Sequence, residues 1–405
     1  MPANEFTKRG LHRAERVLSG YVQRGVVPGL VAAFARGDTT RIEVHGRQDL
    51  DHGQSMRPDS IFRISSMSKP ITAVAALMLV DDCVLRLDDP VHELLPELAD
   101  LRVLKRPGGP LDETVPAERA ITLRDLLTFR AGFGGTWDPD WPLTAAAVER
   151  GVAPQPPRLA PDPTPAPDEY LRRLGELPLA YQPGEAWLYH TGIAVTGVLI
   201  ARAAGRPLED FLRERVFEPL GMDDTGFHVP ADKLDRFTTL YTGDRTSTSG
   251  HALTVADPAE DGRWTSSPQF PDGGGDLVST VEDYLVFARL LLGRGRYSGT
   301  RLLSRPLAEL MTSDQLTAAN KARGGLAPGM WDAAGWGMGV SVVTRRTGYP
   351  AVGQYGWNGG LGTIWFNDPA ENLIGILLTP RMWDSPAAPP VARDFETCVY
   401  AALAD

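Results

Sequence analysis

The chain of 405 residues contains only two cysteines, and both lie in apolar stretches typical of buried helices. Two thiols are too few for a cysteine-rich zinc site, so we expect Cys83 and Cys398 to fill small spaces in the core. H-E-x-x-H helices and Asp-rich calcium loops are also absent from the sequence. Two glycine-rich stretches, GWGMG and PDGGGD, lack the strand–loop–helix setting of a phosphate cradle, and we interpret them as loops. The sequence therefore predicts no metal and no cofactor.

Positive charge is in short supply. Lys and Arg together number 41 against 51 Asp and Glu, which gives a net charge of −10. The basic residues are scattered and form no stripe, so neither nucleic acid nor an anionic membrane surface is an expected partner. The motifs described below, rather than the charge, indicate a small molecule as the partner.

Long hydrophobic runs are missing as well. No apolar stretch reaches the ~18 residues that a transmembrane helix needs. The first residues, MPANEFTKRGLHRAERVL, lack the apolar core of a secretory signal. We therefore expect a cytoplasmic protein, unless a leader has been removed.

The chain does contain a clear series of helix and strand patterns. Helical periodicity covers residues 7–24, and the two strand-like runs of GLVAAFARGDTTRIEVHG flank a Gly-Asp turn, which predicts a hairpin. Further helices are predicted over residues 68–82, in ITLRDLLTFRAGF between a Thr122 cap and a Gly132 stop, in TGIAVTGVLIARAAG up to Gly205, in LEDFLRERVFEPLG, and in STVEDYLVFARLLLGRG with Ser279 and Glu282 as a capping box.

Strand patterns return near the end of the chain, in WGMGVSVV, GTIWF and LIGILLT, and a last helix is predicted over residues 391–403. NDPAEN is a hairpin turn between the last two strands. Strands at both ends with helices between them predict an α/β sheet domain of residues 1–70 and 330–405, and a mainly helical insertion of residues 71–329. The active site is expected between the two domains.

A proline-rich stretch, PQPPRLAPDPTPAP, lies within residues 138–168. Proline interrupts helices and central strands. Because structured patterns resume on both sides, we interpret the stretch as an extended surface excursion within the helical domain. An interdomain linker is the alternative.

The stretch FRISSMSKP carries the strongest chemical signal. Ser66 and Lys69 are three residues apart, so at a helix start both side chains lie on one face. A lysine whose pKa is lowered by burial can remove the proton from a serine hydroxyl, and free N–H groups at a helix start can stabilise an oxyanion. By itself the S-x-x-K spacing is also common by chance, and a serine at a helix start is usually a cap.

Two later segments add further candidates. YQPGEAWLYHTG places Tyr189, His190 and Thr191 at a helix start, and YGWNGGLGTIWFNDP is a glycine-rich turn that leads into a strand. A phenol can shuttle protons, and glycines let a backbone N–H approach a bound carbonyl. The alternatives are a buried tyrosine and a β-bulge.

The order S-x-x-K, Y-x-[NST] and [KHW]-x-G beside a C-terminal hairpin resembles the serine β-lactamase and penicillin-binding-protein superfamily. The resemblance spans nearly the whole chain and is strongest to class C β-lactamases and family VIII carboxylesterases. It implies an α/β (α+β) fold, in which an antiparallel sheet flanked by helices is combined with an inserted, mainly helical domain.

The resemblance also implies roles for individual residues. Ser66 would be the acylated nucleophile, Lys69 would accept or relay its proton, and Tyr189 would act as general base or acid. The backbone N–H groups of Ser66 and Gly360 would form the oxyanion hole. The residues implied to line the substrate site are Trp357, Asn358, Gly359, Thr191 and His190.

This sequence departs from the β-lactamase pattern at two of those positions. Thr191 stands where the pattern has asparagine, and Trp357 stands where it has lysine or histidine, so the cation beside a β-lactam carboxylate is missing. No G-x-S-x-G elbow accompanies His190, so we expect it to line the pocket or to support the residues that do, rather than to serve as the base of a Ser-His-Asp triad. Arg130, in TFRAG, occupies a place where relatives often have histidine.

We therefore expect a cofactor-free serine hydrolase, most readily a carboxylesterase for short- to medium-chain esters. The alternatives on the same site are a β-lactamase, a D-amino-acid peptidase or amidase, and an acyltransferase. A non-catalytic penicillin-sensing or binding module is the alternative from a different class, although an intact Ser66, Lys69 and Tyr189 argue against it.

Overall fold

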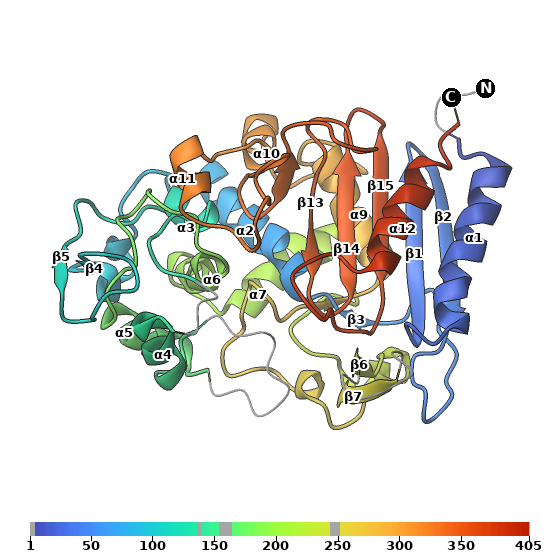
Figure 1. Ribbon diagram of the computed structural model, residues 1–405, viewed down its shortest axis with the longest axis horizontal. Coiled ribbons are helices and arrows are strands. Elements are labelled where there is room, and N and C mark those ends of the chain that lie inside the picture. Colours follow the sequence, from blue (N-terminus) through green and yellow to red (C-terminus); the bar gives the residue numbers. More distant parts are fainter. Residues whose placement is uncertain (1–4, 136–139, 154–163, 244–251, 405) are drawn as a thin grey trace.

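A computed structural model describes residues 5–135, 140–153, 164–243 and 252–404. Its largest element is a 7-stranded sheet with the order β11-β12-β13-β14-β15-β1-β2 (Figure 1), and every neighbouring pair is antiparallel. The strands come from both ends of the chain: β1 (Gly29–Arg36), β2 (Thr39–Gly46), β11 (Ala334–Trp336), β12 (Ser341–Val343), β13 (Tyr355–Gly359), β14 (Thr363–Asp368) and β15 (Leu373–Leu378). The predicted fold class is confirmed.

Helices cover both faces of this sheet. β1 lies between β15 and β2 and is buried along its whole length, because its side chains alternate between two cores. Leu30 and Phe34 point into a core closed by α1 (Lys8–Gln23) and α12 (Pro390–Tyr400). Val31 and its alternate neighbours belong to the main core, which includes α9 (Val281–Leu292).

The remaining elements lie between β2 and β11 in the sequence. The helices are α2 (Ser68–Asp81), α3 (Leu123–Leu127), α4 (Pro142–Glu149), α5 (Pro167–Gly175), α6 (Thr191–Ala204), α7 (Leu208–Leu212), α8 (Glu218–Leu220), α10 (Arg305–Met311) and α11 (Ala318–Ala322). A π-helical turn, η4 (Arg213–Phe217), joins α7 to α8, and the 3₁₀ turns are η1 (Ser65–Met67), η2 (Val91–Glu93), η3 (Pro96–Leu98), η5 (Ala231–Arg236) and η6 (Arg263–Thr265). Paired short strands are β3 (Phe62–Arg63) with β8 (Val278–Ser279), β4 (Arg102–Leu104) with β5 (Thr114–Pro116), β6 (Leu240–Gly243) with β7 (Leu253–Asp257), and β9 (Arg296–Tyr297) with β10 (Thr300–Arg301).

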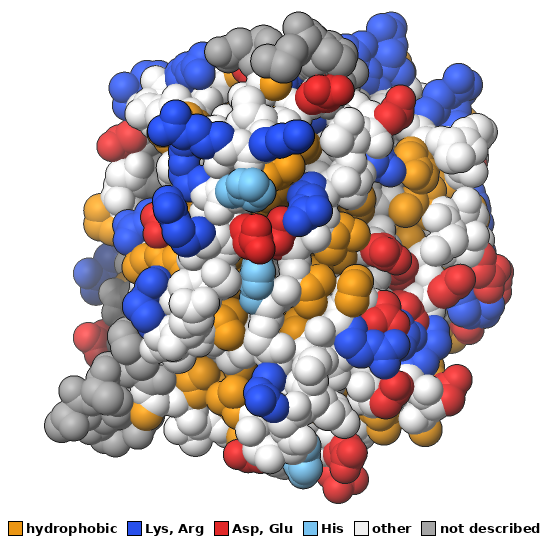
Figure 2. All heavy atoms as spheres, turned by 90° about the vertical axis from the view of Figure 1, so that its right-hand side faces the viewer, with side chains coloured by type: hydrophobic (Ala, Val, Ile, Leu, Met, Phe, Trp, Pro, Cys, Tyr) orange, Lys and Arg blue, Asp and Glu red, His pale blue; other side chains and the backbone are white. Residues whose placement is uncertain are grey.

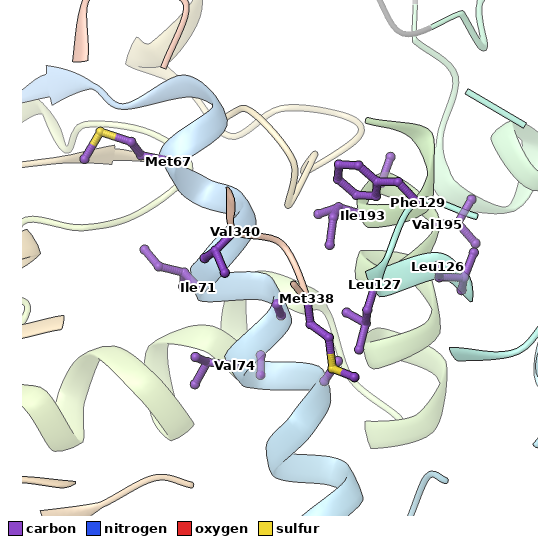
Figure 3. Packing of buried hydrophobic residues seen from close by; sticks show 14 of the residues in the cluster. Met67, Ile71, Val74, Leu126, Leu127, Phe129, Ile193, Val195, Met338 and Val340 are labelled. Atoms are coloured by element: carbon purple, nitrogen blue, oxygen red, sulfur yellow. The ribbon is translucent and has the colours of Figure 1, made fainter. Parts of the chain in front are cut away.

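The helix that follows the S-x-x-K serine is held in apolar surroundings. Side chains from α2, α3 and α6 meet there, with Met338 and Val340 from the loop between β11 and β12 (Figure 3). Gly339, between those two residues, has a φ of +78°. A Cβ at this position would lie 3.1 Å from the Lys69 carbonyl oxygen, so glycine lets the loop pack directly on α2.

Most predicted elements are present, and several differ in detail. WGMGVSVV forms two strands, β11 and β12, rather than one, because Gly337–Val340 turns the chain. The glycine-rich YGWNG stretch is a strand, β13, rather than a turn. The helix after Thr122 ends at Leu127, before a Phe129 with φ of +60°, and not at Gly132.

Two further predictions about local structure are wrong. The cap of α9 is Thr280, whose hydroxyl accepts from Asp283 N, while Ser279 belongs to β8 and pairs with Phe62. Cys83 is exposed just beyond the end of α2, because the chain turns there with a φ of +60°. Cys398 is buried in α12, as predicted.

The described residues around the proline-rich stretch are partly helical. Helices α4 and α5 lie within or beside it, and each begins with proline in the first turn, where the missing N–H costs no helical bond. The central residues 154–163 lie outside the described part of the chain. The division into two domains at residues 70 and 330 stays a prediction, since α9 from the middle of the chain also packs on the sheet.

In the described ranges, no helix has both the length and the apolar character to cross a bilayer. Figure 2 shows the end of the molecule near α1 and β2, where acidic and basic side chains are interspersed.

Candidate active site

Ser66 lies on a short 3₁₀ turn that leads directly into α2. Of the three neighbouring serines, Ser65 and Ser68 are buried, and only Ser66 is partly exposed. The Ser68 hydroxyl donates to the Ser65 carbonyl oxygen (2.6 Å) and accepts from Leu277 N (3.2 Å), which gives it a structural role. The hydroxyl available to a substrate is therefore that of Ser66.

Two side chains converge on the Ser66 Oγ atom. Lys69 Nζ lies 2.9 Å from it, one helical turn along the chain. The Tyr189 hydroxyl donates to it from 2.9 Å and accepts in turn from Trp357 Nε1 at 2.7 Å. The structure thus brings together four residues singled out in the sequence, in one chain of hydrogen bonds.

Burial sets the protonation states of this group. Lys69 is completely buried, and the loss of hydration lowers its pKa from 10.5 to about 7, although the carboxylates of Asp272 and Asp276 act to raise it. Burial raises the pKa of Tyr189 above its usual value, although the hydrogen bonds that Tyr189 makes with Ser66 and Trp357 act to lower it. At neutral pH, Lys69 is therefore the group able to accept a proton, and Tyr189 is a neutral donor.

Lys69 Nζ has two further partners on the side away from Ser66. It donates to the Gly274 carbonyl oxygen at 2.6 Å and lies 3.2 Å from His190 Nδ1. The other ring nitrogen of His190, Nε2, is 2.9 Å from Asp272 Oδ2. For Asp272, burial would raise the pKa, but the charge and hydrogen bond of His190 and the charge of Lys69 hold it below its usual range.

The aromatic residue in the place of the β-lactamase lysine is packed firmly. Trp357 meets Trp336 edge-on with ring centroids 4.6 Å apart, and it lies 5.8 Å from the Tyr189 ring. Phe129 and Trp187 also contact Tyr189. This aromatic cluster fixes the Tyr189 phenol and forms an apolar wall beside Ser66.

The proposed oxyanion-hole segment lies next to the nucleophile turn. Thr363 Oγ1 donates to the Ile64 carbonyl oxygen at 3.0 Å, which ties β14 to the residues just before Ser66. At Gly359 a Cβ would lie 2.3 Å from that same carbonyl oxygen, so only glycine permits the approach. Gly360 follows directly, at the end of β13.

Other predicted site residues lie elsewhere. Asn358 follows Trp357 on β13 and therefore points to the opposite face of the sheet, where it lines a cavity of about 180 Å³ with α12 residues. Thr191 is buried and lines an apolar cavity of about 100 Å³ with Phe133 and Leu143. Arg130 Nε donates to Thr128 Oγ1 at 2.9 Å, and so makes a local structural contact.

Sequence reasoning missed one residue of this group, Asp272. Its stretch, PDGGGD, was interpreted as a plain glycine-rich loop. The only sign of a function in this stretch is that an aspartate stands on each side of the three glycines. Nothing in the local pattern connects these aspartates with Lys69, which lies 205 residues before Gly274 in the sequence.

Several known proteins are similar to this chain over most of its length. Protein Rv1367c of Mycobacterium tuberculosis is 37% identical over 361 residues, which cover 87% of this chain and 86% of that protein. Esterase EstB of Burkholderia gladioli is 29% identical, with coverages of 93% and 92%. The structure of EstCE1, described as a hydrolase with promiscuous acyltransferase activity, superposes with a TM-score of 0.80 at 22% identity and covers 97% of this chain and 99% of that one.

A family model described as Beta-lactamase matches residues 14–393. That match includes the Ser66 turn, the Tyr189 segment and the β13–β14 hairpin, which are the parts that meet at the Ser66 hydroxyl. The chain belongs to the β-lactamase family.

Proposed function

We propose that this protein is a carboxylesterase that forms an acyl-enzyme on Ser66 and acts on esters with short or medium acyl chains. The observation that carries the proposal is the pair of contacts on Ser66 Oγ, from a lysine with a pKa near 7 and from a protonated tyrosine. The similarity of this chain to Esterase EstB supports the same chemistry.

The first half of the reaction uses both contacts. Neutral Lys69 takes the proton of Ser66 as Oγ attacks the ester carbonyl carbon, and the backbone N–H groups of Ser66 and Gly360 stabilise the oxyanion. Collapse of the tetrahedral intermediate breaks the bond to the alcohol oxygen. Tyr189 gives that oxygen a proton, and the proton held by Lys69 restores the phenol through the hydrogen-bonded chain.

The second half repeats these steps with water. Water attacks the acyl carbonyl carbon and loses a proton to the same base, and Ser66 Oγ leaves with a proton. The products are the carboxylic acid and the free enzyme. An alcohol in place of water would give a new ester by the same steps, so acyl transfer is an outcome that the assay must separate from hydrolysis.

The surroundings of Ser66 favour neutral esters over β-lactams. A β-lactam antibiotic carries a carboxylate close to the reacting ring, and burying an unpaired charge costs several kcal/mol. Trp357 offers one N–H, and Tyr189 already accepts it. An apolar acyl chain instead gains from the aromatic wall that Trp357 and Tyr189 form with Trp336.

The proposal is tested by comparing p-nitrophenyl butyrate, nitrocefin and a D-alanyl peptide, with and without an added alcohol. We expect kcat/KM for the ester to exceed that for nitrocefin by at least about tenfold, which corresponds to roughly 1.4 kcal/mol. A fluorophosphonate should label Ser66, and Ser66→Ala should abolish both labelling and turnover. An adduct on Ser65 or Ser68, or equal turnover of nitrocefin, would overturn the assignment.

A further inference from the structure

His190 and Asp272 lie beside Lys69, and the steps above make no use of them. His190 Nδ1 is 3.2 Å from Lys69 Nζ, and His190 Nε2 is 2.9 Å from Asp272 Oδ2. Both side chains are 17% exposed, so the pair is mostly enclosed. The three residues form a continuous line that leads away from Ser66.

The backbone at His190 is bent in an unusual way to make this contact. Its φ of 77° and ψ of −63°, with a hydrogen bond from Thr191 N to the Tyr189 carbonyl oxygen (3.1 Å), define a γ-turn with positive φ. This turn is rare and strained for a residue with a side chain. In an extended chain, neighbouring side chains would point to opposite faces. The turn lets Tyr189 reach Ser66 while His190 reaches Lys69.

The carboxylate of Asp272 fixes which nitrogen of His190 carries the proton. Because a carboxylate only accepts, His190 Nε2 must carry a proton, and in the neutral imidazole Nδ1 then presents a lone pair to Lys69. Asp272 is itself held, since its Oδ1 atom accepts from Gly274 N at 2.7 Å.

This arrangement fixes the orientation of a neutral Lys69. A neutral amine has two N–H bonds and one lone pair. The Gly274 carbonyl oxygen and His190 Nδ1 are both pure acceptors, so each takes one N–H of Lys69. The lone pair is then left pointing at the third neighbour, Ser66 Oγ, whose proton it must remove.

We infer that His190 and Asp272 are positioning residues that aim the lone pair of Lys69 at Ser66. This inference rests on the proposed function, because it assigns Lys69 as the base in acylation. It differs from a Ser-His-Asp triad in that the imidazole never contacts the serine and acts only through the amine.

Asp272→Asn is the sharpest variant. Gly274 N donates to Oδ1, so it will hold the carboxamide oxygen and turn the NH₂ group toward His190 Nε2. That nitrogen must then accept, which moves the imidazole proton to Nδ1 and points an N–H at Lys69. We expect the high-pH plateau of kcat for p-nitrophenyl butyrate to fall about 100-fold or more, the low end of general-base contributions, with little change in KM.

Asp276→Asn is the matched control. Asp276 pairs with Arg263 (2.9 Å), and its charge acts on Lys69 in the same direction as that of Asp272. Among the described residues, the titratable groups that face Lys69 are these two carboxylates, His190 and Tyr189. Each Asn variant removes one negative charge, so in both the acid limb of the pH profile should move to lower pH. Only Asp272→Asn should lower the plateau, while Asp276→Asn stays within about threefold.

A double-mutant cycle checks the result without relying on one variant. His190→Phe removes the acceptor but keeps a ring, and we expect the same fall in kcat; adding Asp272→Asn should make it no worse, because the two residues act through one contact. If Asp272→Asn does not fold, as judged by thermal melting, the kcat of His190→Phe alone decides.

The rate of fluorophosphonate labelling separates this inference from the proposed function. A wild-type protein that fails to label Ser66 overturns both. If the wild-type protein labels normally, three results would each overturn the inference alone. Asp272→Asn could label as fast as the wild type, or Asp276→Asn could lose as much kcat as Asp272→Asn. The third result is a double variant of His190→Phe and Asp272→Asn in which the two losses of kcat multiply.

Discussion

At the scale of single residues, burial decides which neighbour of Ser66 is able to accept a proton. Lys69 and Tyr189 make equivalent contacts of 2.9 Å with Ser66 Oγ, so distance does not separate them. The low-dielectric surroundings disfavour the charged form of each residue, which lowers the pKa of the amine and raises that of the phenol. The same burial therefore makes the lysine an acceptor and the tyrosine a donor.

The pH profile of kcat/KM tests this assignment. The neutral amine is the active form, so activity should rise with pH through about 7 and be lost below it as Lys69 binds a proton.

Lys69→Ala and Tyr189→Phe should each lower kcat by about 10²–10⁴-fold, and the double variant should be little worse, since both act on one oxygen. Ser68→Ala is the control and should leave kcat within a few-fold. In the pH profile of the wild-type protein, an acid limb near pH 4 would contradict the assignment of Lys69 as the base.

At the scale of elements, the site depends on loops that press against α2. The β11–β12 loop is the clearest case, since Gly339 combines a positive φ with close contact to the Lys69 backbone. Any side chain there must both adopt a disfavoured backbone conformation and push on the helix that carries the base.

Gly339→Ala should therefore lower both stability and activity. The left-handed backbone alone costs an L-residue roughly 1–2 kcal/mol. Gly353→Ala is a matched control, because Gly353 has a φ of +92° and a Cβ there would meet no atom of the described residues within 4 Å, its chain neighbours aside. Because both glycines have a positive φ, we expect both variants to lose a similar unfolding free energy in urea from backbone strain. Only Gly339→Ala should also lower kcat. Unchanged kcat in both would show that the loop does not position Lys69.

At the scale of the whole molecule, the two chain ends share one sheet. β1 pairs with β15, and the core between α1, α12 and the sheet contains Phe34 and Phe395, whose ring centroids are 5.6 Å apart. This core lies on the face of the sheet away from the main core that surrounds α2. Its packing should hold the scaffold together without touching the chemistry.

Phe395→Ala should separate these two contributions. Truncation of a completely buried phenylalanine costs about 3–5 kcal/mol. We expect a lower midpoint in urea, measured by circular dichroism, and an unchanged kcat at temperatures where the variant is folded. A large fall in kcat in the folded variant would show that the sheet core also controls the site.

The sequence by itself determined many of the local elements and the pairing of Ser66 with Lys69. Helical and alternating apolar patterns are properties of a short stretch, so α1, the β1–β2 hairpin, α2 and α6 were predictable from residue order alone. The S-x-x-K spacing places two side chains one helical turn apart in any helix, which made the pair of Ser66 and Lys69 predictable as well.

Only the tertiary structure decided what surrounds that pair. The pKa of Lys69 depends on its complete burial and on charges from the loop of residues 272–276, which approach it through chain folding rather than through sequence proximity. The γ-turn at His190 lets the neighbouring side chains of Tyr189 and His190 reach Ser66 and Lys69, and the alternation along β13 directs Asn358 away from Ser66. Burial and long-range approach depend on all elements at once, so no local pattern could contain them.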